Sequence, residues 1–121
     1  MPARILVVDD ERNIQLTLSR ALSMEGYTVE VAGGGNEALE RIAATPVDLV
    51  VMDVRMPDLD GIEATRRLRA SGLRTPIIAL TADVLDRRDQ YIDGGYTDEF
   101  AKPVEIDDLT ARIAALLAAS R

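Results

Sequence analysis

Five short, mostly apolar runs divide this chain, and a segment of different periodicity follows each of them. The runs are continuous and rich in β-branched residues, which is typical of strands that a parallel sheet buries on both faces. The predicted strands cover Arg4–Val8, Thr28–Ala32, Leu49–Met52, Ile77–Leu80 and Glu99–Ala101.

Apolar residues in the intervening segments recur at the three- and four-residue spacing of amphipathic helices. This spacing predicts helices over about residues 11–25, 38–43, 61–71, 85–93 and 106–121. Gly26, Pro46 and Gly72 stand where three of these helices end. The alternation of strand and helix predicts an α/β fold, a flavodoxin-like (βα)5 doubly wound parallel sheet with helices on both faces.

Reactive types of residue follow four of the five predicted strands. Asp9-Asp10 follows the first strand, Asp53 the third, Thr81 the fourth and Lys102 the fifth. Ligands of open α/β sheets bind outside the carboxyl ends of the strands, so these side chains are expected to meet at one edge. The acidic strand ends must then be neighbours, which places the first and third strands side by side, and the predicted strand order of this fold is 2-1-3-4-5. Such an edge suits a divalent metal and a phosphoryl group, with a carboxylate as nucleophile.

The composition excludes several classes of function. The chain has 121 residues, enough for one domain with its own core. Its formal charge of −7 disfavours direct binding to nucleic acid. It has no run of about 18 apolar residues, so no membrane segment is expected. Cysteine and histidine are absent; the first fits a cytoplasmic location, and the second means that any phosphohistidine must belong to a partner.

Four motifs, spread in order over nearly the whole chain, carry a family resemblance. They are VVDDE at 7–11, MDVRMPDLDG at 52–61, ALTA at 79–82 and Lys102-Pro103. Any one of them is weak alone, but all four at these spacings are highly specific. The chain resembles the receiver domain of bacterial two-component response regulators. Residues 1–121 are expected to form one receiver domain, with no output domain.

The resemblance implies roles for the residues at the strand ends. Asp53 would be the phosphoacceptor, and Thr81 and Lys102 would bind the phosphoryl oxygens. The implied Mg²⁺ site consists of Asp9, Asp10, Asp53 and the main-chain carbonyl of Arg55, with Asp9 acting mostly through water. A cis peptide bond before Pro103 is also implied. The chemistry agrees, because Mg²⁺ prefers oxygen ligands and lysine can stabilise charge on phosphoryl oxygens.

The resemblance also implies the partners. The phosphoryl donor would be the phosphohistidine of a sensor histidine kinase or of a histidine phosphotransfer protein. The signal would pass to a downstream effector protein or output domain through phosphorylation-dependent contacts. Such a domain is not an enzyme with a separate substrate, although it catalyses its own phosphorylation and dephosphorylation. Neither nucleic acid nor a membrane is expected as a direct partner.

Other functions remain open from the sequence. The chain is either a stand-alone regulator or a receiver module of a hybrid histidine kinase or transcription factor, and the sequence does not decide between them. An aspartyl-phosphate phosphohydrolase would use Asp53 as nucleophile, but it needs a second acid where Arg55 stands. A flavin-binding protein would need a phosphate loop in place of Asp9-Asp10. A pseudo-receiver would not be expected to keep the full set of reactive residues.

Several features also have a purely structural interpretation. Asp9-Asp10 could cap the helix that follows. Gly33–Gly35 lacks the other residues of a phosphate-binding loop and is predicted to be a flexible turn. A solvated face is the favoured interpretation of the basic cluster Arg66, Arg67, Arg69 and Arg74.

Three positions depart from the family pattern or vary within it. Many receivers carry an aromatic residue three positions before the lysine, where this chain has Glu99. A carboxylate is costly to bury, which argues against the usual aromatic switch. Arg55 and Asp83 border the route of attacking water, and they are hypothesised to pair over the mouth of the site.

Overall fold

The computed structural model describes residues 2–82 and 95–120, which form strands and helices in alternation. The strands are β1 (Arg4–Val8), β2 (Thr28–Ala32), β3 (Leu49–Asp53), β4 (Ile77–Thr81) and β5 (Asp98–Ala101). The helices are α1 (Arg12–Met24), α2 (Gly35–Ala44), α3 (Gly61–Ala70) and α5 (Ile106–Ala119). None of the helices in these ranges combines the length and the apolarity that crossing a membrane requires. The helix predicted over 85–93 and the residue Asp83 lie outside the described residues.

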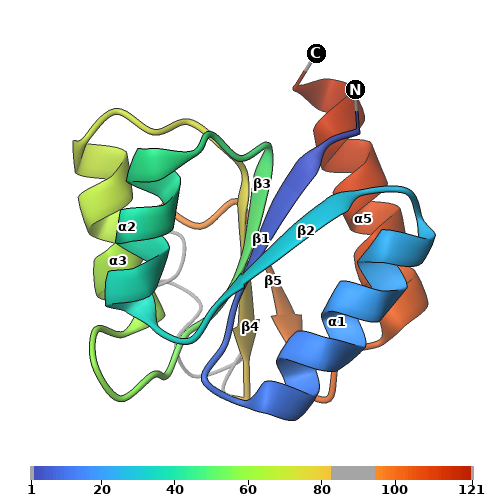
Figure 1. The fold of residues 1–121 in the computed structure, drawn as a ribbon, viewed down its shortest axis with the longest axis horizontal. Coiled ribbons are helices and arrows are strands. Elements are labelled where there is room, and N and C mark those ends of the chain that lie inside the picture. The colour runs from blue at the N-terminus through green and yellow to red at the C-terminus, as the bar shows by residue number, and fades with distance from the viewer. Residues whose placement is uncertain (1, 83–94, 121) are drawn as a thin grey trace.

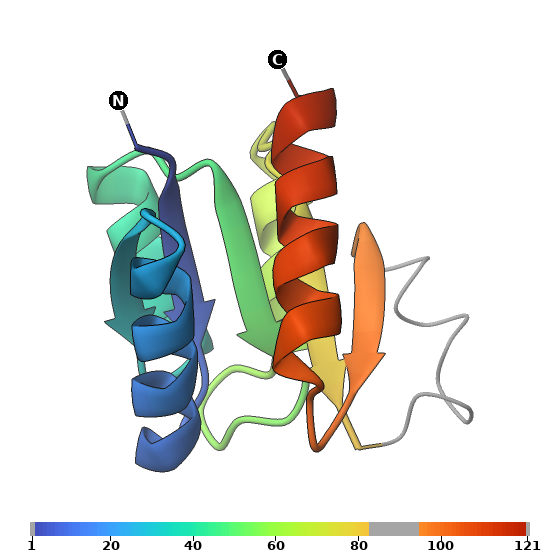
Figure 2. The ribbon, with the colours of Figure 1, turned by 90° about the vertical axis from the view of Figure 1, so that its right-hand side faces the viewer.

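The strands form one parallel sheet in the order β2-β1-β3-β4-β5, which confirms the predicted order. Helices α1 and α5 cover one face of the sheet, and α2 and α3 cover the other (Figure 1). Because the strands are parallel, their carboxyl ends lie together, at the lower edge in Figure 2. This edge is the carboxyl edge below, and the opposite one is the amino edge.

The three central strands, β1, β3 and β4, are buried almost throughout, because helices cover both faces of the sheet. Alternate side chains of a strand point to opposite faces. Leu6 and Val50 therefore pack with the α2 and α3 side of the core, whereas Val7 and Val51 pack with the α1 and α5 side. The result is a rigid platform for the residues at the strand ends.

Two central strands extend one residue beyond their predicted ends, so that β3 includes Asp53 and β4 includes Thr81. The ladder continues past the apolar runs. The backbone N–H of Val54 donates to the carbonyl of Leu80 at 3.1 Å, and that of Lys102 donates to the carbonyl of Thr81 at 2.9 Å. The sheet itself therefore fixes the backbone beneath both polar side chains.

The turn predicted at Gly33–Gly35 is wrong at its end, because Gly35 is the first residue of α2 and Gly34 is its N-cap. The helix thus begins three residues before Ala38, the first residue that the periodicity indicated. Gly34 and Gly35 are both buried. The segment is a closely packed helix start and not a flexible turn.

The predicted solvated arginine face needs a correction at one position. Arg66, Arg67 and Arg74 are exposed, but Arg69 is half-buried. Its guanidinium donates to the main-chain carbonyls of Leu73, Thr75 and Gly95, at 3.0, 2.7 and 2.9 Å. Arg69 therefore joins α3 to the segments that lead into β4 and β5, and its role is structural.

Candidate acidic site at the carboxyl edge

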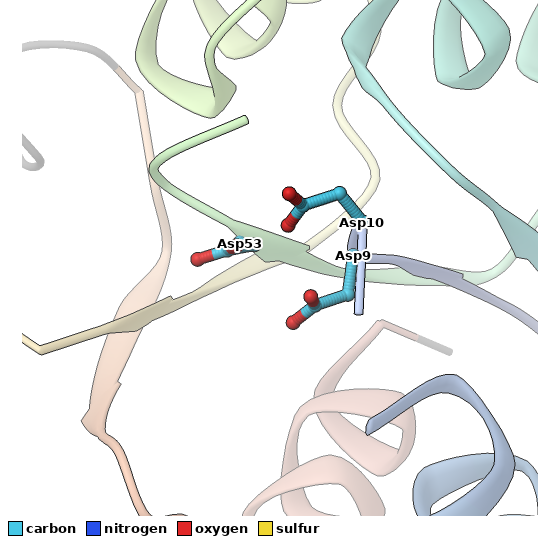
Figure 3. Close-up of side chains that lie close together, drawn as sticks. All are labelled: Asp9, Asp10 and Asp53. Atoms are coloured by element: carbon cyan, nitrogen blue, oxygen red, sulfur yellow. The ribbon is translucent and has the colours of Figure 1, made fainter. Parts of the chain in front are cut away.

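Three aspartates meet at the carboxyl edge, where β1 and β3 end side by side (Figure 3). Asp9 and Asp10 follow β1, and Asp53 is the last residue of β3. One carboxylate oxygen from each of the three lies within 4.8 Å of the other two. Asp9 and Asp53 are 0% and 5% exposed, whereas Asp10 is open to solvent. The structure therefore brings together the three acids predicted to form the site.

Hydrogen bonds hold Asp9 on three sides. Its backbone N–H donates to the carbonyl of Ala32 at 3.1 Å, and its Oδ1 accepts the backbone N–H of Glu11 at 2.9 Å. Its carbonyl accepts the side-chain amide of Gln15 at 2.7 Å. The bond to Glu11, the N-cap of α1, agrees in part with the capping interpretation. Gln15 was missed by the sequence analysis, because nothing in the pattern of this helix singles it out.

Lys102 reaches the two buried acids from the segment after β5. Its Nζ lies 3.2 Å from Asp9 Oδ2, 3.2 Å from Asp53 Oδ1 and 4.0 Å from Glu11 Oε1. The peptide bond between Lys102 and Pro103 is cis, as the resemblance implied. One ammonium therefore faces several carboxylates and does not balance their charge.

The excess of negative charge shifts the pKa values of the site. Burial, followed by the charge of Asp9, raises the pKa of Asp53 to about 6, although Lys102 acts in the opposite direction. Burial also raises the pKa of Asp9. Burial lowers the pKa of Lys102, but the nearby charges of Asp53 and Asp9 outweigh it and the net shift is upward. Without a metal, the site thus keeps like charges close together where water is scarce.

Thr81 and Arg55 lie where the sequence predicted them, at the carboxyl edge. Thr81 ends β4, beside β3, is 2% exposed, and pairs with Ala101, the residue before Lys102. Arg55 stands two residues after Asp53, in the loop that follows β3, and it is exposed. Their positions agree with the expected roles, and the roles themselves stay predictions.

Gly61 allows the loop after β3 to close on itself. Its backbone N–H donates to the carbonyl of Val54 at 2.8 Å, so the two ends of the loop meet. A Cβ on Gly61 would contact the main-chain oxygen of Asp53 and would lie 2.5 Å from the hydroxyl of Tyr96. Tyr96 packs in the core on the α2 and α3 side, close to this loop. The sequence analysis had not singled out Tyr96, because a lone aromatic residue carries no pattern.

The donor set suits a small divalent cation. Mg²⁺ prefers oxygen ligands, usually binds through one or two carboxylates, and keeps several waters. Asp9, Asp10 and Asp53 each offer an oxygen to a shared position, and the exposure of Asp10 leaves room for water. A cation there would also offset the repulsion that raises the pKa of Asp53. The residues present therefore fit Mg²⁺.

Comparison with known proteins connects this geometry to a family. The sequence profile of the family described as response regulator receiver domain matches residues 5–114. Response regulator MprA of Mycolicibacterium vanbaalenii is 49% identical over 118 residues, which cover 97% of this chain and 51% of that protein. The chain thus spans about half the length of the curated relatives it matches.

Solved structures of similar proteins share the fold. The receiver domain of the Francisella response regulator 1452 is 32% identical, with a TM-score of 0.94, and the match covers 98% of this chain and 99% of that one. Vibrio cholerae chemotaxis protein CheY4 is 29% identical, with a TM-score of 0.88, and the match covers 96% and 99%. The chain therefore belongs to the family of response regulator receiver domains of two-component systems, which are homologous to CheY-like phosphoacceptor domains.

Proposed function

We propose that this receiver domain is a phosphorylatable signalling switch whose phosphoacceptor is Asp53. The domain accepts a phosphoryl group from the phosphohistidine of a sensor histidine kinase or of a histidine phosphotransfer protein, in a Mg²⁺-dependent reaction. The phosphorylated form passes the signal to an effector protein or an output domain through protein contacts. The domain catalyses both its own phosphorylation and its own dephosphorylation.

One observation carries the proposal: Asp53 contacts the ammonium group of Lys102 at an edge where two further carboxylates lie close by. Its Oδ1 is 3.2 Å from Lys102 Nζ, and Asp9 and Asp10 each place an oxygen within 4.8 Å. Its position at the end of a buried strand holds its backbone in place. This combination of an acid, a nearby lysine and a cation-binding group is what phosphoryl transfer to a carboxylate requires.

Each residue of the site has a part in the transfer. A carboxylate oxygen of Asp53 forms the new bond to phosphorus, while the bond from phosphorus to the donor's histidine nitrogen breaks and that nitrogen keeps the electron pair. Since the pKa of Asp53 is about 6, the carboxylate is mostly ionised at neutral pH and is available as the nucleophile. Lys102 and Thr81 are proposed to hold the phosphoryl oxygens, the first by charge and the second by its hydroxyl.

The proposed Mg²⁺ ligands are Asp9, Asp10, Asp53 and the main-chain carbonyl of Arg55. When bound, Mg²⁺ supplies positive charge that offsets the carboxylates and orients the phosphoryl oxygens. The hydrogen bond from the backbone of Glu11 holds Oδ1 of Asp9, and the side chain of Gln15 holds its main-chain carbonyl. The other carboxylate oxygen, Oδ2, lies 3.2 Å from Lys102 Nζ and stays directed at the site.

Dephosphorylation and location complete the proposal. Water attacks the phosphorus in line with the bond to Asp53, and the same residues that promote transfer hold the group during its loss. The proposed location is the cytoplasm, where sensor kinases present their phosphohistidine. Direct binding to nucleic acid is not part of the function, because the chain carries a formal charge of −7.

The proposal is tested by incubating the protein with acetyl phosphate, a small phosphoryl donor, and measuring its intact mass. With millimolar Mg²⁺ the wild type should gain roughly 80 Da, the mass of one phosphoryl group. With EDTA in place of Mg²⁺ the gain should disappear.

Two variants control this experiment. Asp53→Ala should gain no mass, whereas Asp48→Ala, which removes a carboxylate at the amino edge, should gain as much as the wild type. If the wild type gains nothing, or if Asp53→Ala gains as much as the wild type, the proposal is wrong.

A further inference from the structure

The start of α2 binds an anionic side chain of the protein itself, the carboxylate of Asp58. The geometry of a helix leaves its first backbone N–H groups, here those of Gly35 and Asn36, without a partner inside the helix. The carboxylate of Asp58, in the loop after β3, accepts both of them, at 3.3 Å and 3.2 Å. Negative charge is favourable at this end of a helix. The start of α2, at the glycine segment 33–35, therefore binds Asp58 and not an external phosphate group.

The loop lies so close to the start of α2 that two positions there require glycine. A Cβ on Gly34 would clash with the carboxylate of Asp58, and a Cβ on Gly35 would clash with the main-chain oxygen of Leu59. A Cβ on Gly33, by contrast, would lie 3.7 Å from its nearest neighbour, which is ordinary van der Waals contact. Gly34 and Gly35 therefore let the loop lie directly against the start of α2, beside which it runs in Figure 1.

The same loop carries the proposed metal ligand between two anchors. At its base, the hydrogen bond from Gly61 to Val54 joins the two ends of the loop. At its tip, Asp58 joins the loop to α2. Arg55 lies between these anchors, directly after Val54. The path that its main chain follows is thus fixed at the base by the sheet and at the tip by α2.

We propose that Asp58 is a positioning residue for the metal site: by docking the loop on the start of α2, it fixes the main-chain carbonyl of Arg55 relative to Asp9, Asp10 and Asp53. The inference rests on the proposed function, in which these groups hold Mg²⁺. Since coupling between two binding events is reciprocal, a metal bound at the site also strengthens the contact between Asp58 and α2.

Asp58 can act on the metal in two ways that experiments can separate. Hydrogen bonds, first among them that from the backbone of Leu59, hold its pKa below the usual range, so it is charged at neutral pH. That charge attracts a cation from a distance, whereas docking of the loop uses both carboxylate oxygens, one for each N–H group. Asparagine carries no charge and keeps one acceptor oxygen, so it can accept one of the two N–H groups. Asp58→Asn therefore removes the charge and keeps part of the docking, whereas Gly35→Ala disturbs the docking and keeps the charge.

The first experiment is calorimetric titration of the folded variants with Mg²⁺ at neutral pH, well below their melting temperatures. Asp58→Ala should weaken Mg²⁺ binding by about 3- to 10-fold, less than the loss typical of direct partners of metal ligands because Asp58 acts through the loop. Asp58→Asn, which keeps one of the two acceptor oxygens, should lose less affinity than Asp58→Ala. Gly35→Ala should weaken binding as Asp58→Ala does, and the double variant should be little weaker than the weaker of the two.

Two matched controls accompany these variants. Gly33→Ala introduces the same methyl group two residues away, where there is room for it, and should bind Mg²⁺ as the wild type does. Asp48→Asn removes a carboxylate that also accepts a backbone N–H, that of Arg4, but at the amino edge, and should likewise leave the affinity unchanged.

The second experiment needs no variant, so it does not depend on how well a substituted chain folds. Hydrogen exchange of the wild type is measured with EDTA and with saturating Mg²⁺. The amides of Gly35 and Asn36 should exchange several-fold more slowly with Mg²⁺, while the amide of Arg4, bound to Asp48, should not change.

The outcomes distinguish this inference from the proposed function. If the wild type binds Mg²⁺ but Asp58→Ala binds it equally well, or if exchange at Gly35 and Asn36 ignores Mg²⁺, Asp58 has no positioning role and the proposed function stands. If Asp58→Asn loses as much affinity as Asp58→Ala while Gly35→Ala binds Mg²⁺ as the wild type does, charge and not docking is responsible, and the inference is wrong. If the wild type binds no Mg²⁺ at all, the metal site itself is absent and both statements fall.

Discussion

The two edges of the sheet use the same kinds of side chain in opposite ways. At the amino edge two acids each have their own donor: Asp48 accepts a backbone N–H at 2.7 Å, and Asp98 pairs with a guanidinium at 2.6 Å. At the carboxyl edge Asp9 and Asp53 share one lysine, at 3.2 Å each, and Asp10 stands close by. The first arrangement gives each of these two acids a partner within the chain, and the second leaves an excess of negative charge at the site.

Burial makes this difference larger. The ion pair at Asp98 is partly exposed, and pairs of this kind contribute about 0–1 kcal/mol to stability. Asp9 and Asp53 are almost fully buried, and burial is the first cause of the upward shift in both pKa values. The carboxyl edge therefore lowers the stability of the metal-free protein and keeps its reactive groups in place. Both edges carry aspartates, so the presence of an acid does not mark the functional edge. The edges differ in how deeply the aspartates are buried and in the partners that the aspartates have.

The largest effect should come from the lysine that the two buried acids share. Lys102→Ala should slow phosphorylation by acetyl phosphate on the order of 10²- to 10³-fold, the loss typical when one group that stabilises a transition-state oxygen is removed. Arg112→Ala, which removes the cation paired with Asp98, should leave the rate unchanged. The rate of mass gain at fixed Mg²⁺ gives the phosphorylation rate of each variant. Equal rates for the two variants would contradict the claim that only the carboxyl edge takes part in phosphorylation.

The pH dependence of the metal-free protein should show the cost of the carboxyl edge. The pKa of Asp53 rises from 3.8 to about 6 on folding, so the folded state binds more protons between these values. The stability that this group contributes is present below pH 3.8 and is lost as the pH rises through about 6. At roughly 1.4 kcal/mol per pKa unit, the loss is about 3 kcal/mol for this buried group.

Asp53→Asn should remove this part of the pH dependence and should be more stable than the wild type at pH 8 in EDTA. Asp98→Asn, at the other edge, should not be stabilised. Urea unfolding at several pH values measures both. A wild type whose stability is flat or rises between pH 4 and pH 6, relative to Asp53→Asn, would contradict the raised pKa.

Mg²⁺ should stabilise the wild type by an amount that follows its concentration. A ligand bound only by the folded state adds about 2.7 kcal/mol at 100 times its Kd. Asp10→Asn should reduce this gain because it removes one ligand charge, whereas Asp48→Asn should keep it. Melting temperatures with and without Mg²⁺ test this, and identical values for the wild type would show that the carboxyl edge does not bind Mg²⁺.

The smallest effect should come from the amino edge itself. Arg112→Ala should cost about 0–1 kcal/mol of stability, since its partner Asp98 and the guanidinium are both partly exposed. Its affinity for Mg²⁺, measured by titration calorimetry, should equal that of the wild type. A large loss of affinity in this variant would mean that the two edges are coupled through the sheet, and the simple contrast between them would fail.

The strands and the acidic edge were predictable because both follow from local patterns along the chain. Continuous apolar runs mark buried parallel strands, and the parallel arrangement with β1 beside β3 brings Asp9 and Asp53 together. The exact strand ends were not predictable in the same way. Asp53 and Thr81 belong to their strands because backbone hydrogen bonds between neighbouring strands continue past the apolar residues. The apolar pattern of the sequence does not show where these hydrogen bonds end.

The residues missed at the site act through contacts between distant positions. Asp58 and Gly35 are 23 residues apart, and neither carries a periodic signal, so a flexible turn was the natural prediction for the glycines. Gln15 and Arg69 are polar residues on helices, where the usual expectation is a solvated face. Only the packing of the helices against the sheet shows that both side chains turn back onto main-chain carbonyls.

The central claim is that the carboxyl edge directs a phosphoryl group to Asp53, and one measurement tests it most directly. The protein is phosphorylated with acetyl phosphate and Mg²⁺ and then reduced with borohydride, which converts an aspartyl phosphate to homoserine. Peptide mass spectrometry then locates the homoserine. The account predicts homoserine at position 53 and an unchanged aspartate at positions 9, 10, 48 and 98. Homoserine at any of those four positions, or at none in the chain, would contradict it.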